Sequence, residues 1–363
     1  MALSRAGIFE RKGAIVTMGT GWRRIGALAL AWFGAAILST GLVSATRASA
    51  GPSPEPKGAT APAAPTRDRF DAHWQDGKGE QSAYRYSVSR YGQRRDGTAV
   101  LIYVTEPFSE SRRVKVDDPK KNPKDTFEAL KVNFVREFQT GIYDYHTLAS
   151  VFTRTGDFSP AKITFSSAEW CGHVFEEMIF HRHHIADRYQ SYFEGESNLN
   201  RITRREGSLT EEELLVRLRG LREDWIRPGE RKTVPFLPSA FYRRLTHRPL
   251  AWSEAKVERA RGLETVRVPA GRFETSVVMV RTEQRVGRFW IESAYPHRIV
   301  RWEWTAATSG SGGRAEALDR GELTGSARLA YWKLNGPDGE RYRRELGLPP
   351  ASAPPSQAQR VRN

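Results

Sequence analysis

The single cysteine of the chain, Cys171, lies in the run AEWCGHVF over residues 168–175, with Glu169 and His173 two residues to either side. If this run is a β-strand, the three side chains share one face and are attached about 6.5–7 Å apart. A carboxylate, a thiol and an imidazole in a row would form an activated nucleophile, with His173 lowering the pKa of the thiol. Catalytic cysteines usually take their base from another element, however, and no oxyanion-hole motif is visible. We therefore favour the interpretation that Cys171 is a buried or half-buried small apolar residue.

Five residues could instead form a metal site. The candidate ligands are Cys171, His173, His181, His183 and His184. Two pairs with i, i+2 spacing would give a Cys-His₃ set that suits zinc. The pairs meet only if the chain reverses within VFEEMIF, which contains no turn residue. The alternatives are a helix that gathers three of these histidines with Glu177, and a hairpin tip at HRHHIAD with the histidines in solvent. We favour the hairpin tip and predict no bound cofactor.

A third candidate site is the run SYFEGES, in which Glu194 and Glu196 flank Gly195. Paired carboxylates could act as acid and base or hold a cation. We favour the simpler interpretation, a strand that ends in a charged turn.

Alternating apolar and polar residues predict β-strands around these candidate sites. In AYRYSVSRYG, Tyr84, Tyr86 and Val88 share one face. The run TAVLIYVTEPF is apolar on both faces, as a central strand would be. Further strands are predicted at LKVNFVREF, AKITFSS and DRYQSYFE.

The C-terminal half predicts two hairpins and a last strand. In LETVRVPAGRFETSVVMVR, Pro269, Ala270 and Gly271 form the turn, because proline pre-sets it and glycine allows the left-handed conformation. In VGRFWIESAYPHRIVRWEW, the loop contains Tyr295-Pro296-His297. A last strand is predicted in GELTGSARLAYWKLN.

One helix is predicted over SLTEEELLVRLRGLRED, residues 208–224, where Thr210 and Glu213 have capping-box spacing. A second, short helix is predicted around 125–130. Many hairpin-connected strands with one or two helices predict a mainly β fold, namely a large curved antiparallel sheet or half-barrel with one or two covering helices. Such a sheet would enclose an apolar cavity on its concave face.

The N-terminal residues predict export. A 19-residue apolar run follows Arg23-Arg24 and precedes ASA at 48–50, so residues 1–50 have the pattern of a signal peptide. An uncleaved anchor is the alternative, because 19 apolar residues can just span a bilayer. Residues 51–66 form a Pro/Ala-rich linker, 67–348 a β-rich exported domain whose halves would meet near 205–230, and 349–363 a disordered tail. The predicted location is the periplasm or cell envelope, or outside the cell.

The formal net charge of +15 is typical of an arginine-rich, solvated surface, and we favour this interpretation; the alternative is attraction to anionic partners. Lipid headgroups, cell-wall polymers and lipopolysaccharide fit an exported protein near a membrane. Nucleic acid is not expected as a partner, because no binding motif of basic and aromatic residues is visible. With one cysteine, the chain forms no internal disulfide.

Several stretches of the chain resemble known sequences. A group of uncharacterised secreted bacterial proteins is similar to HWQDGKGE, SRYGQRRDGTAVLIYVTEPF, FQTGIYDYHTLASVF, SSAEWCGHVF and SYFEGES. The segment VRVPAGRFET…GRFWIESAYPHRIVRW is similar to a periplasmic domain family of unknown function with a lipoprotein-carrier-like half-barrel. Together the resemblance covers most of residues 73–335 and implies no catalytic residue.

These observations predict an exported, non-enzymatic envelope protein that binds a hydrophobic or lipidic ligand, or a lipidated protein, in the concave face of its sheet. Two alternatives stay open. The chain could be a ligand-free scaffold or interaction protein of the envelope, or a hydrolase or transferase that uses Cys171 and His173 or a metal.

Overall fold

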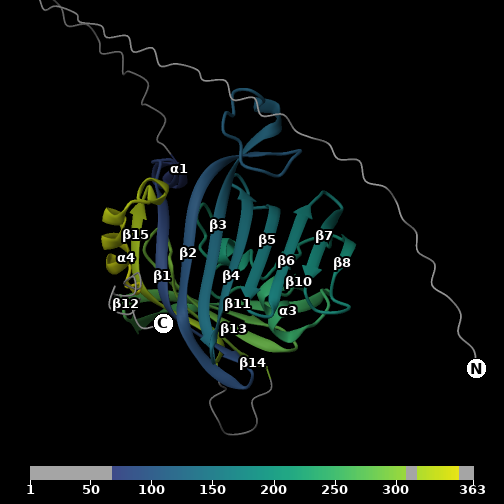
Figure 1. Ribbon diagram of the computed structural model, residues 1–363. Coiled ribbons are helices and arrows are strands. Elements are labelled where there is room, and N and C mark those ends of the chain that lie inside the picture. The colour runs from purple at the N-terminus through teal and green to yellow at the C-terminus, as the bar shows by residue number, and fades with distance from the viewer. Residues whose placement is uncertain (1–67, 308–316, 351–363) are drawn as a thin grey trace, which may run out of the picture. The chain divides into compact units, whose positions relative to one another are not determined.

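The computed structural model describes residues 68–307 and 317–350. These residues form a mainly β structure around one large, curved, open sheet with a few short helices (Figure 1). The predicted fold class is confirmed. The predicted leader over 1–50, the linker over 51–66 and residues 351–363 of the predicted tail lie outside the described residues. None of the helices in the described ranges has the length and apolar character that spanning a bilayer requires.

Fifteen strands make up the sheet in the described part of the chain. In chain order they are β1 (Gly79–Arg90), β2 (Gln93–Ser109), β3 (Thr126–Thr140), β4 (Tyr143–Arg154), β5 (Pro160–Glu169), β6 (Gly172–Phe180), β7 (His184–Ser191), β8 (Asn198–Thr203), β9 (Leu209–Thr210), β10 (Arg231–Leu237), β11 (Ser253–Val268), β12 (Gly271–Arg281), β13 (Arg285–Glu292), β14 (Ile299–Ala306) and β15 (Ala317–Leu329). The α-helices are α1 (Arg69–Trp74), α2 (Leu214–Arg217), α3 (Ala240–Thr246) and α4 (Glu340–Glu345), and three short 3₁₀ turns are η1 (Pro123–Asp125), η2 (Tyr331–Lys333) and η3 (Pro337–Gly339).

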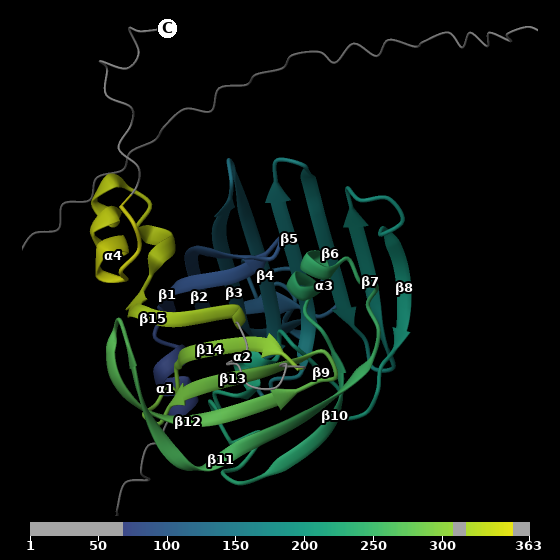
Figure 2. The ribbon, with the colours of Figure 1, turned by 90° about the horizontal axis from the view of Figure 1, so that it is seen from below.

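The strand order explains the curvature of the sheet. From β1 to β8 the chain runs outward to one edge, and from β10 to β15 it runs back from the other edge until β15 pairs with β1. Residues 204–208 alone connect β8 to β9, and these strands lie at opposite edges of the sheet. Because five linking residues span roughly 20 Å at most, the sheet must bend until its edges approach one another. Figure 2 shows the two halves facing each other across an interior that contains α2 and α3.

The predicted strands follow the alternation of their side chains. In β1, Tyr84, Tyr86 and Val88 are buried on the concave face, as predicted. The first C-terminal hairpin joins β11 to β12 through Pro269 and Ala270, with Gly271 as the first residue of β12. The second joins β13 to β14 around the Tyr295-Pro296-His297 loop. Both predicted hairpins and the last strand are therefore confirmed. The halves that were predicted to meet near 205–230 belong to one continuous sheet.

The two helix predictions need correction. Over 208–224 the capping box does form, because the Thr210 amide donates to Glu213 Oε2 at 3.0 Å. However, α2 contains only four residues, and Thr210 itself lies in β9. The predicted helix around 125–130 is wrong, because residues from Thr126 onward continue the ladder between β2 and β3.

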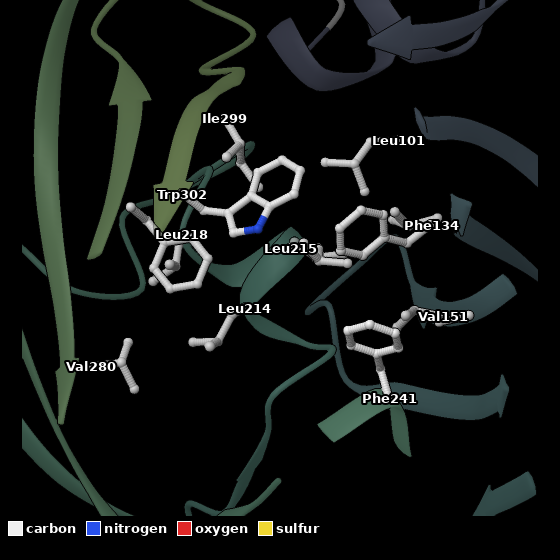
Figure 3. Packing of buried hydrophobic residues seen from close by; sticks show 14 of the residues in the cluster. Leu101, Phe134, Val151, Leu214, Leu215, Leu218, Phe241, Val280, Ile299 and Trp302 are labelled. Carbon is white, nitrogen blue, oxygen red and sulfur yellow. The ribbon is translucent and has the colours of Figure 1, made fainter. Parts of the chain in front are cut away.

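The apolar core lies on the concave face and is completed by the chain itself. Leu214, Leu215 and Leu218, in and beside α2, point between the two halves of the sheet (Figure 3). They pack into the same cluster as Leu101 of β2 and Trp302 of β14. Three of the four residues of α2, Leu214, Leu215 and Val216, are buried, so packing inside the sheet accounts for its apolar sequence. The inserted segment, by which we mean residues 211–226 together with residues 239–246 on the far side of β10, therefore occupies the concave face.

Candidate functional site

Cys171 lies in the two-residue turn between β5 and β6. Glu169 ends β5, Trp170 and Cys171 form the turn, and Gly172 begins β6. In this hairpin Glu169 pairs with Gly172, and Ala168 with His173. The predicted single strand is therefore wrong. Glu169 is buried on the concave face, whereas His173 is exposed on the convex face, so the predicted triad does not assemble.

The environment of the Cys171 thiol also differs from the predictions. Cys171 is exposed, so its predicted role as a buried apolar residue is wrong. Its backbone amide donates to Glu169 Oε2 at 2.7 Å. A hydrogen bond with Glu169 raises the pKa of the thiol, because a neighbouring carboxylate disfavours the thiolate. The prediction that His173 lowers this pKa is wrong.

The histidines lie at a hairpin tip, as predicted. Residues 181–183 connect β6 to β7, and His184 begins β7. The rings of His181 and His184 stack with their centroids 4.4 Å apart. Burial, followed by the nearby Arg201, lowers the pKa of His184. Because β6 runs straight, His173 is about 25 Å from His181 at about 3.3 Å per residue. No three His, Cys, Asp or Glu side chains in the described ranges could hold a metal ion, so the predicted Cys-His₃ set is not assembled.

The two carboxylates of SYFEGES have separate surroundings. Glu196 Oε1 is 2.6 Å from His247 Nδ1, and Glu196 Oε2 accepts a hydrogen bond from Ser191 Oγ at 2.6 Å. Partial burial opposes the ionisation of Glu196, but the contacts with Ser191 and His247 outweigh it and lower its pKa. Glu194 is exposed in the turn between β7 and β8. Glu196 thus connects this turn to the end of α3.

Three buried arginines of the inserted segment hold it against acidic residues of the sheet. Arg219 forms a two-pronged pair with Glu80 of β1, with both N···O distances 2.9 Å. Arg244 of α3 donates to Glu169 at 3.0 Å. All four side chains are almost fully buried. Each of these charges is therefore neutralised by its partner within the protein. Glu169 forms its ion pair with Arg244.

The third arginine, Arg243 of α3, faces two carboxylates. It lies 2.7 Å from Glu176 on β6 and 3.8 Å from Asp187 on β7. Burial raises the pKa of Glu176 and of Asp187. One guanidinium balances only one negative charge, so this buried pair of carboxyl groups favours a state that keeps one proton.

Little space remains between α2 and the concave face. A cavity between Phe134, Trp302 and Phe241 has a volume of about 30 Å³. A volume of this size holds little more than one water molecule. Glu212 Oε2 and Arg136 Nε, which belong to residues that line this cavity, have no hydrogen-bond partner among the described residues. At this cavity, beside α2, a ligand could enter only if the inserted segment moved away. A more open pocket of about 270 Å³ lies at the end of α3, beside Tyr189 and Arg243.

A larger pocket lies on the convex face, beneath the C-terminal segment. Its volume is about 310 Å³. The floor comes from β1, β2 and β3, and the roof from residues 331–348. Most of its walls are apolar or aromatic, and they include Val100, Ile102, Val135, Leu329, Tyr331, Leu334, Tyr342, Leu346 and Leu348. The lower end of the usual volume range for small-molecule sites is near this value. We call it the Gln81 pocket.

Gln81 is the unusual residue of this pocket. Only 4% of its surface is exposed, because β1 is covered on both faces at this point. Neither its side-chain oxygen nor its side-chain nitrogen has a hydrogen-bond partner within residues 68–307 and 317–350. Buried amides are normally paired, and leaving one unpaired costs about 1–3 kcal/mol. The arrangement therefore offers one acceptor and one donor to a molecule in the pocket.

A groove of about 720 Å³ lies beside α3 and the turn between β12 and β13. Exposed charges of both signs line it, including Arg248, Lys256 and Glu283. Because these charged groups are exposed, they form hydrogen bonds with water. They therefore do not require a ligand as a hydrogen-bond partner, in contrast to the buried amide of Gln81.

Sequence reasoning missed both the interior ion pairs and the Gln81 pocket. The ion pairs join residues that are far apart in the chain, such as Glu80 and Arg219. From the local pattern of apolar and polar residues alone, an arginine that stands among leucines would be expected to face solvent. No known protein-family model, curated protein or solved structure matches the chain.

Proposed function

We propose that the chain is an exported, non-enzymatic envelope protein that binds a hydrophobic or lipidic ligand in the Gln81 pocket. The observation that carries this proposal is the buried, unpaired amide of Gln81 within apolar walls. Binding sites for small molecules commonly combine apolar walls with a few polar groups that fix orientation. The concave face, in which the sequence analysis placed the ligand, is occupied by the inserted segment.

The pocket favours a particular class of ligand. Val100, Ile102 and Leu346 offer apolar contacts to a chain or ring. The amide of Gln81 can accept and donate at the same time. A medium-length acyl chain that ends in a protonated carboxyl, an amide or a hydroxyl group would satisfy both requirements. The proposed ligand is therefore a single-chain amphipathic lipid or its acyl group.

The residues that could support an enzyme are engaged elsewhere. The pKa of Cys171 is raised, and Glu169 is paired with buried Arg244. A nucleophilic cysteine requires a lowered pKa or an adjacent base. These observations favour binding over catalysis. The ligand-free scaffold remains the second candidate, because the concave face is filled by the protein itself.

Titration with a fluorescent dodecanoic acid analogue tests the proposal. Val100→Trp fills the pocket and should weaken binding at least tenfold. Gln81→Leu should weaken it at least about fivefold, because a net hydrogen bond is worth about 1 kcal/mol and 1.4 kcal/mol is tenfold in affinity. Phe175→Trp places the same side chain elsewhere on the convex face, on β6 and away from the residues that line the pocket, and should bind like the wild type.

The stability of Gln81→Leu separates a binding role from a purely structural one. Removing an unpaired amide should leave the free energy of unfolding unchanged or increase it. Weaker binding by a folded, equally stable variant supports the proposal. Absence of binding by the wild type, or equal binding by Val100→Trp, would favour the scaffold instead.

A further inference from the structure

Four turns of the sheet lie at the same end of its first half. They connect β1 to β2, β3 to β4, β5 to β6, and β7 to β8. In an antiparallel meander every second turn falls at the same end. Each of these turns begins with, contains or directly adjoins a large exposed apolar side chain, and these are Tyr91, Ile142, Trp170 and Tyr192. We call these four residues the aromatic rim.

Contacts between neighbouring turns confirm that the rim is continuous. Tyr143, beside Ile142, has its hydroxyl 3.3 Å from that of Tyr91. Its ring centroid lies 6.4 Å from that of Trp170. At the next hairpin, a Cβ atom on Gly172 would lie only 2.5 Å from the ring of Tyr192, so Tyr192 packs directly on this glycine.

The rim is far more exposed than apolar side chains of this size normally are. Its exposed fractions are 59% for Tyr91, 78% for Ile142, 70% for Trp170 and 64% for Tyr192. Contiguous exposed apolar surface on a soluble protein marks an interaction site. Hairpin turns usually contain Asn, Asp and Gly. Three of the rim turns have other sequences, and none of the three contains a charged residue. They are Tyr91-Gly92, Gly141-Ile142 and Trp170-Cys171.

We propose that the aromatic rim rests on a lipid bilayer and inserts its side chains at the level of the headgroups. Tryptophan and tyrosine favour this level, because each ring has an apolar body and a polar group. The three uncharged tips can enter it without removing a charge from water, whereas the turn after Tyr192 contains the exposed Glu194, which stays in water. The nearby strands carry both signs, such as Arg94 paired with Asp96 at 2.7 Å, so no anionic lipid is required. This interaction goes beyond ligand binding and does not depend on the Gln81 pocket.

A bilayer fits the rim better than a protein partner does. The four side chains lie at the tips of successive hairpins. The Tyr91 hydroxyl contacts that of Tyr143, and Tyr192 packs on Gly172, but much of each side chain stays exposed. A protein that received them would need a separate pocket for each tip. A membrane surface accepts a row of such tips in any register.

Cys171 provides a natural probe for the test, because it is the only cysteine of the chain, is exposed, and adjoins Trp170. The full chain is labelled there with an environment-sensitive fluorophore and mixed with phosphatidylcholine vesicles that carry nitroxide lipids. We expect a blue shift and strong quenching. The matched control carries Cys171→Ser with Lys121→Cys, which places the same label in the exposed loop at the opposite end of the sheet.

The comparison of the two labels separates rim docking from attachment through another segment. At least threefold stronger quenching at Cys171 than at position 121 supports the proposal. Ile142→Ser combined with Tyr192→Ser should reduce quenching at Cys171 at least fivefold, whereas Leu263→Ser with Val114→Ser removes exposed apolar groups elsewhere and should not. Equal quenching of both labels, or none at Cys171, would overturn it. The proposal would also be overturned if the label at Cys171 shifted to the blue only when an envelope protein was added, and not with lipid vesicles alone.

Discussion

Burial controls the protonation of Glu212, which lies beside the small concave cavity. Burial is the main cause, followed by the neighbouring Glu211, and together they raise the pKa of Glu212 to about 7. Glu212 Oε1 accepts a hydrogen bond from the backbone amide of Ala240 at 2.9 Å, at the start of α3. The protonated carboxyl keeps this contact without bringing a second negative charge close to Glu211.

Glu212 should therefore make the protein less stable as the pH rises. The folded state holds its proton up to about pH 7, whereas the ordinary pKa of the group is 4.5. The stabilising contribution is complete below pH 4.5 and is lost as the pH passes through 7, a change of roughly 3 kcal/mol. Glu212→Gln keeps the acceptor and removes the titration. Urea unfolding at pH 5 and pH 8 should show a smaller difference for the variant, and an unchanged difference would contradict this assignment.

The reactivity of Cys171 follows from its neighbour Glu169 and not from His173. We expect its reaction with a disulfide reagent to show a midpoint above pH 9.0, because Glu169 raises the pKa of the thiol above that value. His173→Ala should leave this midpoint in place, since His173 faces the opposite side of the sheet. A midpoint below pH 9.0, or a midpoint that shifts in His173→Ala, would instead support the interpretation of Cys171 as an activated nucleophile.

At the scale of elements, α3 is held inside the sheet by its charges. Its seven residues include two buried arginines, and the caps at both ends also form contacts. Arg90 of β1 donates to the carbonyl of Leu245 at 2.8 Å, and Ser239 caps the first turn. The helix is too short to be stable alone. Its ion pairs with β5, β6 and β7 position it.

Removal of Arg243 tests this role of the buried charges. Arg243→Ala would leave Glu176 and Asp187 buried without a counter-charge, and should cost about 3–5 kcal/mol in the free energy of unfolding. The control is Arg231→Ala, which removes an arginine paired with Glu258 on the exposed surface. It should leave stability unchanged, because exposed ion pairs contribute little. Similar losses in both variants would show that α3 is not held by its buried charges.

The predictable elements were those defined by local pattern. Alternation identified β1 and the C-terminal hairpins, and Pro269 with Gly271 marked a turn. The capping box of Thr210 and Glu213 was also real, yet the helix stopped after Arg217, because α2 packs inside the sheet and the next residues turn at Gly220, whose φ is +56°. Local sequence contains no signal for that insertion.

The candidate site was not predictable, because its parts come from distant segments. Gln81 is one of several polar residues in β1, and only the roof formed by residues 331–348 distinguishes it. The same holds for Arg219, whose partner Glu80 is 139 residues away. Cys171 and the histidines attracted attention because of their residue types, but they lie in two exposed turns.

At the scale of the whole described unit, the topology ties its two halves together. The first and last strands, β1 and β15, pair in the middle of the sheet. The inserted segment contacts both halves, since Tyr103 of β2 donates to the carbonyl of Leu215, and Arg219 donates to the carbonyl of Pro296. The concave side thus serves as the core, and the proposed ligand pocket lies on the convex side.

Native mass spectrometry after expression with export tests this division most directly. The account predicts that the wild type and Phe175→Trp carry a bound molecule with the mass of a single-chain lipid, and that Val100→Trp does not. Gentle purification without detergent preserves such a complex, and organic extraction then identifies the molecule. A wild type without any bound molecule, or a Val100→Trp variant that retains one, would contradict the proposed site.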